Sequence, residues 1–136
     1  MQQINLIIAD YKTILVGIFL FMHGFVYFNL SRGLFSNADN QLGISVLIGK
    51  FINKNTLDLL IKALWLLAGL GFIIIGIMIA FNRQLGELTS LILIAISIVG
   101  IISFTLYWDG ISNNLITAGL IGAIIDFIII VVVLIS

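Results

Sequence analysis

Long apolar runs separated by short polar stretches dominate the pattern of this chain. The first run covers about residues 11–30 and carries one histidine, His23, near its middle. Three more runs cover about 56–81, 88–108 and 114–135. About 20 apolar residues in a helix cover the hydrocarbon core of a bilayer, because each residue adds about 1.5 Å. The pattern therefore predicts four membrane-spanning helices.

The polar stretches predict how these helices are connected. The stretches after the second and third runs are short, so each should join antiparallel neighbours. Only the stretch 31–55 is long, and its first half is rich in turn residues. Its second half, about 41–54, mixes apolar and polar residues and is too short to span. We expect a short helix there that either lies in the membrane interface or packs flat on the mouth of the bundle.

Composition agrees with a membrane location. The chain is 62% hydrophobic and 9% charged, whereas a soluble domain carries about 25% charged residues. We expect one domain, residues 1–136, with an all-α, antiparallel up-down four-helix bundle as its fold. The N-terminus lacks the basic start and cleavage site of a signal peptide, so the first span should be retained. The expected location is a cell membrane that the chain crosses several times.

Several function classes are excluded or disfavoured by composition. The chain has six basic and six acidic residues, so no excess of positive charge favours binding to nucleic acid. The chain has no cysteine, which excludes thiolate metal sites and thiol redox chemistry. With one histidine and no zinc, phosphate-loop or nucleophile motif, we expect no metal, no cofactor and no catalytic residues. An enzyme is the least favoured reading.

Two ionisable residues, His23 and Asp126, lie deep in the predicted spans. The first and fourth helices run in opposite directions, and each residue lies about 3 Å beyond the centre of its helix. Side chains on facing helices can bridge the resulting offset of about 6 Å. Either group alone in lipid is costly. We therefore predict that the two face the interior, within reach of a hydrogen bond or a single water.

Three roles remain open for this pair. It can fix helix packing, because buried polar pairs serve packing specificity in some proteins, and this reading comes first. It can carry protons, or it can bind the polar head of an apolar ligand such as a quinone or lipid. Tyr27 lies one turn from His23 and would extend the polar track. His23, Asp126 and Tyr27 are thus the candidate ligand or proton-site residues.

Small residues form stripes on the later helices and predict close helix packing. In the second span Gly76 and Ala80 make a small-xxx-small pair, and Gly69 lies two turns earlier. In the third, Ser97 and Gly100 share a face. In the fourth, Gly122 shares a face with Asp126. These residues are the helix-packing candidates.

Several weak motifs give a family resemblance. They are His23-Gly24, the segment from Trp65 through Ala68-Gly69 to Phe72, and the serine-rich third span ending in Tyr107-Trp108. The chain resembles the DoxX-like group of small four-helix membrane proteins over most of residues 11–134. The resemblance implies a four-helix bundle in a prokaryotic membrane. Some members are linked to quinone or sulfur-compound redox systems, but no redox motif maps onto residues of this chain.

The sequence therefore favours a non-enzymatic or accessory membrane protein in contact with the lipid bilayer. A carrier of an apolar ligand and a small multidrug-type transporter are the alternatives, and a homo-oligomer or a membrane partner remains open. A filled core beside His23 would favour the packing role, and a cavity there would favour a ligand. The positive-inside rule weighs Arg32, Lys50, Lys54 and Lys62 against Lys12 and Arg83. It predicts a cytoplasmic long connection and both termini outside.

Overall fold

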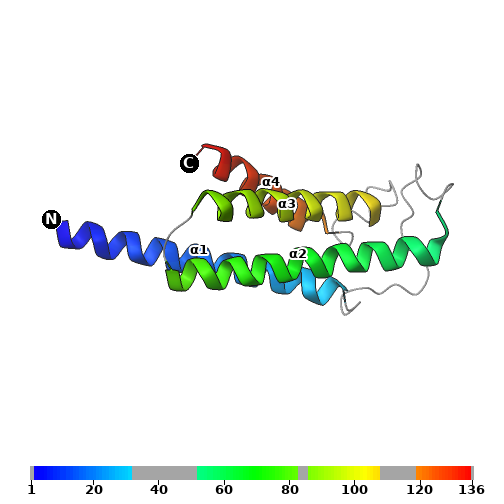
Figure 1. The fold of residues 1–136 in the computed structure, drawn as a ribbon, viewed down its shortest axis with the longest axis horizontal. Coiled ribbons are helices and arrows are strands. Elements are labelled where there is room, and N and C mark those ends of the chain that lie inside the picture. Colours follow the sequence, from blue (N-terminus) through cyan, green and yellow to red (C-terminus); the bar gives the residue numbers. More distant parts are fainter. Residues whose placement is uncertain (1, 32–51, 83–85, 108–118, 136) are drawn as a thin grey trace.

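Four helices form the part of the chain that the computed structural model describes, residues 2–31, 52–82, 86–107 and 119–135. In chain order they are α1 (Gln2–Ser31), α2 (Lys54–Asn82), α3 (Glu87–Tyr107) and α4 (Leu120–Ile135). Figure 1 shows that successive helices run antiparallel and that the N- and C-terminal ends lie at the same end of the bundle. The predicted all-α, up-down arrangement is confirmed for these residues.

Three of the helices are long and apolar enough to cross a bilayer: Tyr11–Ser31, Thr56–Phe81 and Glu87–Tyr107. This finding indicates a multi-pass membrane protein. The described part of α4 is also apolar but has 16 residues, or about 24 Å of helix. The helix begins at Leu120 rather than near 114, because Gly119 forms a turn with a φ of +97°. Residues 114–118 of the predicted fourth span lie outside the described residues, so a fourth crossing stays a prediction.

The helix ends differ from the predicted ones in places. The helical backbone of α1 continues back to Gln2, and Figure 1 shows its first turns reaching past the bundle. The apolar run predicted a second helix from about residue 56, but the helix begins two residues earlier, at Lys54. The Leu57 amide donates to the Asn53 carbonyl at 3.0 Å, so Asn53 occupies the cap position. Asparagine is among the preferred residues at a helix cap.

The predicted interfacial segment, about 41–54, cannot be placed as a whole. Residues 41–51 lie outside the described residues, and Lys54 belongs to α2 rather than to a separate helix. Most of the connections after α2 and after α3 also lie outside them.

Two glycine pairs bring the backbones of α1 and α2 into direct contact. A Cβ added at Gly24 would lie 2.6 Å from the Gly69 carbonyl oxygen, and one added at Gly17 would lie 2.7 Å from the Gly76 carbonyl oxygen. Each pair of glycines on one helix is separated by seven residues, or about two turns. Small residues allow this close approach, which is a common basis of helix association in membranes. Gly69 and Gly76, which were predicted to serve helix packing, therefore lie at the contact with α1, and Ala80 also lies beside Gly17.

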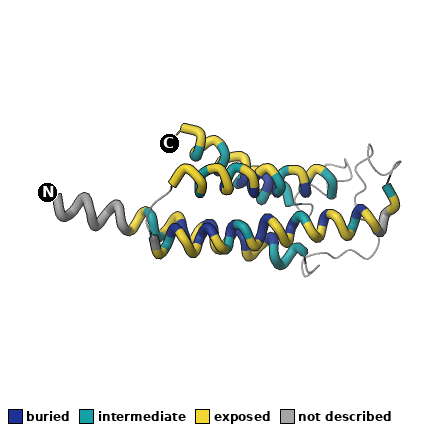
Figure 2. Tube along the Cα trace, viewed as in Figure 1, coloured by how far each residue is buried: buried dark blue, intermediate teal, exposed yellow. Residues whose placement is uncertain are grey.

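Buried residues of α2 form the centre of the structure. This helix packs against both α1 and α3, while α4 packs on α3. Ala68 and Phe72 are fully buried, and Ile75 and Ile79 nearly so. Figure 2 shows buried positions facing the interior and exposed positions on the outer faces. Most of the exposed side chains are large and apolar, as a surface in contact with lipid tails requires.

Candidate functional site

Helix periodicity places His23 and Tyr27 on the interior face of α1. They lie one turn apart, and Leu20 precedes them on the same face. The side chains are 5% and 3% exposed, respectively. Asp126, on the facing side of α4, is completely buried between Ala123 and Ile129, which share its face. Three polar side chains from α1 and α4 thus face one another in the interior of the bundle.

Both oxygens of the Asp126 carboxyl group make hydrogen bonds. His23 Nε2 lies 2.8 Å from Oδ1, and the Tyr27 hydroxyl donates to Oδ2. The predicted contact between His23 and Asp126 is confirmed, and Tyr27 joins it. We refer to His23, Tyr27 and Asp126 as the polar cluster. Its role in ligand or proton binding stays a prediction.

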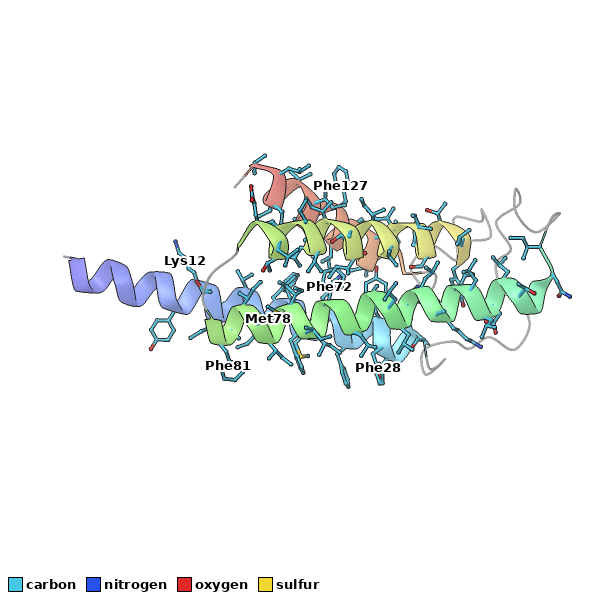
Figure 3. The ribbon with its side chains drawn as sticks, viewed as in Figure 1. Lys12, Phe28, Phe72, Met78, Phe81 and Phe127 are labelled. Carbon is cyan, nitrogen blue, oxygen red and sulfur yellow. The ribbon has the colours of Figure 1, made fainter. Side chains whose placement is uncertain are left out.

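Aromatic rings surround the polar cluster. The Phe72 ring meets the His23 ring edge-on, with centroids 4.8 Å apart, and stacks against Tyr27 at 6.1 Å. Phe19 stacks on His23 at 6.2 Å. In Figure 3, Phe72 lies between α2 and α3, whereas Phe81 and Phe127 point away from the bundle. These rings keep lipid and bulk water from the cluster on their sides.

Two glycines lie beside the polar cluster. A Cβ at Gly100 of α3 would collide with Asp126 Oδ2 and would lie 2.5 Å from the Tyr27 hydroxyl. A Cβ at Gly122 of α4 would lie 3.4 Å from the same hydroxyl, an ordinary contact. The sequence predicted packing roles for both residues. The structure places them beside the polar cluster, where Gly100 leaves no space for a side chain.

The chemistry open to the polar cluster is that of neutral or proton-sharing hydrogen bonds. A lone ionised carboxylate in an apolar interior is very costly, and an imidazole and a phenol beside it supply the donors that lower the cost. Within the described ranges, no group of three or more His, Cys, Asp or Glu side chains could hold a metal ion. The cluster has one carboxylate and one imidazole, fewer ligands than a metal site needs.

A shallow apolar groove lies elsewhere on the surface. Its volume is about 110 Å³, and it opens between the outer faces of α1 and α2. Its lining includes Gly17, Phe21, Gly76 and Ala80 but no member of the polar cluster. The groove therefore offers no route for a ligand to the buried carboxylate.

Comparison with protein-family models, with curated proteins and with solved structures gives no match for this chain. The site is therefore interpreted from its own geometry.

Three contributors to the site were not predicted from the residues themselves. Phe72 entered only through a family resemblance, as did Gly24, and Gly17 was not singled out. A usable signal was present, because Gly17 and Gly24 repeat the seven-residue spacing of Gly69 and Gly76. Matching spacings on two helices predict two close backbone contacts in one register.

Proposed function

We propose that this chain is a non-enzymatic, accessory membrane protein in which the polar cluster fastens the last helix to the first. The cluster acts as a packing lock. The observation that carries this proposal is the surroundings of the Asp126 carboxyl group, which is fully buried and has a hydrogen-bond partner on each oxygen. A site prepared to bind a ligand through this group would leave one oxygen without a protein partner.

The packing lock is needed because apolar contacts alone do not fix the rotation and the depth of α4 in the bundle. All described residues of α4 except Asp126 and two small residues, Gly122 and Ala123, are leucine, isoleucine, valine or phenylalanine. Lipid tails are as apolar as these side chains, so there is no hydrophobic gain that selects one helix face over another. A carboxylate that finds donors only at one rotation and one depth supplies that selection.

The membrane arrangement is the second part of the proposal. We infer that α4, which begins after the turn at Gly119, is a fourth span, and that the long connection is cytoplasmic with both termini outside. The charge distribution near the span ends supports this orientation. A prokaryotic cell membrane and kinship with the DoxX-like group rest on the sequence resemblance alone. A reporter fused after Ser136 that is active only in the cytoplasm should stay inactive, and its activity would reverse the orientation.

The carrier and transporter readings have less support. The apolar groove between α1 and α2 is lined by no residue of the polar cluster. A carrier would need a path from that surface to Asp126, and Phe72 and Phe19 occupy the space beside His23.

A set of apolar replacements tests the lock. Asp126→Leu alone strands two buried donors, so we expect it to lower the free energy of unfolding in detergent by about 1–3 kcal/mol. Replacing the whole cluster, with His23→Leu, Tyr27→Phe and Asp126→Leu together, should recover at least half of that loss, because no donor is then unpaired. Asp58→Asn is the matched control, since Asp58 is a carboxylate at the exposed start of α2. An Asp126→Leu protein as stable as the control would contradict the lock.

A further inference from the structure

The hydroxyl of Ser97 is a buried polar group without a partner. The residue is completely buried on α3. Among the described residues, its Oγ is the only fully buried side-chain nitrogen or oxygen that makes no hydrogen bond. Such groups are rare in folded proteins, and an internal water or bound group is a usual explanation. The cost of leaving the hydroxyl unpaired is greatest in a membrane interior, where bulk water cannot reach it.

Three other helical hydroxyls make local hydrogen bonds. Each donates to a backbone carbonyl three or four residues earlier, at 2.7–2.9 Å: Ser31, Ser103 and Thr105. This local bond is the ordinary solution for serine and threonine in a helix. Ser97 has the same option and does not use it. Its hydroxyl therefore remains available for a partner outside its own helix.

Helix register places Ser97 one turn of α3 from the polar cluster. Gly100 lies beside the polar atoms of the cluster, because a Cβ at Gly100 would collide with Asp126 Oδ2 and approach the Tyr27 hydroxyl. Ser97 precedes Gly100 by three residues, or about 4.5 Å along the helix axis, and both are buried on α3. Both α1 and α3 are antiparallel to α2, so they run in the same direction. The step from Gly100 to Ser97 therefore points the same way along the bundle as the step from Tyr27 to His23.

We propose that Ser97 forms an internal binding site for one water molecule, which links its hydroxyl to the His23–Asp126 side of the polar cluster. Water fits this position chemically, because it can both donate to and accept from a hydroxyl and a carboxylate–imidazole pair. Water molecules in such sites make about three hydrogen bonds to groups that would otherwise be unsatisfied.

The bound water extends the polar cluster from two helices to three. Ser97, the water, His23, Asp126 and Tyr27 then form one continuous hydrogen-bonded chain through the interior. Protons of the buried pair can exchange along such a chain without exposing the carboxylate to lipid. This inference adds a bound water to the packing lock and is tested independently of it. The lock is tested by the free energy of unfolding, and the water by its closeness to the His23 ring.

Nuclear magnetic resonance on protein labelled at histidine tests the site, because His23 is the only histidine in the chain. Magnetisation is transferred from water to the carbon-bound protons of the His23 ring in protein reconstituted in deuterated lipid. We expect transfer in the natural protein and its loss in Ser97→Ala. Ser103→Ala is the matched control, since Ser103 is equally buried on α3 but bonds its own helix, and it should retain the transfer.

Two results would overturn the proposal. One is the lack of transfer to His23 in the natural protein, which needs no variant to fold. The other is transfer of equal strength in Ser97→Ala and Ser103→Ala, which would place the nearest water away from Ser97.

Discussion

His23 and Asp126 stand 103 positions apart in the chain, yet His23 Nε2 lies 2.8 Å from Asp126 Oδ1 in the interior of the bundle. The contact joins the first helix to the last, and Tyr27 reinforces it from the next turn of α1. Neither α2 nor α3 contributes a charged group to it. Their contribution is steric, through the Phe72 ring and the missing side chain of Gly100.

The proton of the imidazole should reside on Nε2. An ionised Asp126 can only accept, so the nitrogen that faces Oδ1 must donate. The nitrogen-15 spectrum of the single histidine should therefore show a protonated Nε2, and this signature should disappear in Asp126→Leu. A spectrum with an unprotonated Nε2 in the natural protein would mean that the carboxyl group is the donor.

Gly24→Ala should weaken the contact between α1 and α2. Its new Cβ would lie 2.6 Å from the Gly69 carbonyl oxygen and 2.8 Å from the Phe72 Cβ, so the backbones must separate. We expect a loss of about 1–3 kcal/mol in the free energy of unfolding. Gly86→Ala is the control, because nothing lies within 4 Å of a Cβ at that position. Equal stability of the two variants would refute direct backbone contact.

Gly100→Ala should disturb the polar cluster from a third helix. The added methyl group collides with Asp126 and approaches the Tyr27 hydroxyl. We expect both a loss of stability of about 1–3 kcal/mol and a changed nitrogen-15 shift of His23. Gly122→Ala faces the same hydroxyl at an ordinary contact distance and should leave the His23 shift unchanged. If the two variants give the same shift, Gly100 has no special place beside the carboxylate.

The ion pair between Asp58 and Lys62 should contribute little. The two atoms are 2.7 Å apart, four residues apart on α2, but the Lys62 side chain is 47% exposed. Exposed pairs of this type stabilise by about 0.3–0.5 kcal/mol. Lys62→Ala should therefore shift the free energy of unfolding by no more than that. A larger loss would show that Lys62 has another role, such as anchoring α2 at the headgroups.

Much of the helical arrangement could be predicted from the sequence, because each membrane span corresponds to a continuous run of apolar residues. The ranges 56–81 and 88–108 agree with the apolar helices Thr56–Phe81 and Glu87–Tyr107 to within one residue. Helix ends outside the apolar runs were harder to predict. The backbone of α1 continues to Gln2, and α2 begins after Asn53 rather than near residue 56, because several polar residues there can begin a helix.

The contact between His23 and Asp126 could also be predicted. Each group alone in lipid is energetically unfavourable, and two such groups at similar depth on facing helices can stabilise each other by pairing. The surroundings of the pair could not. Whether Gly100 faces α4, or Phe72 faces His23, depends on the rotation of each helix about its axis. Uniformly apolar helices carry little information about rotation, and the unpartnered Ser97 hydroxyl becomes visible only once that rotation is known.

A double-mutant cycle on His23 and Asp126 tests the lock most directly. The free energy of unfolding is measured for the natural protein, His23→Leu, Asp126→Leu and the double variant, with His23→Leu and Asp58→Asn as the control cycle. We expect a coupling energy of about 0.6–1.7 kcal/mol, the range found for hydrogen bonds between membrane helices. The control cycle should be additive to within about 0.3–0.5 kcal/mol. Additive losses in the His23–Asp126 cycle would contradict a lock between the first and last helices.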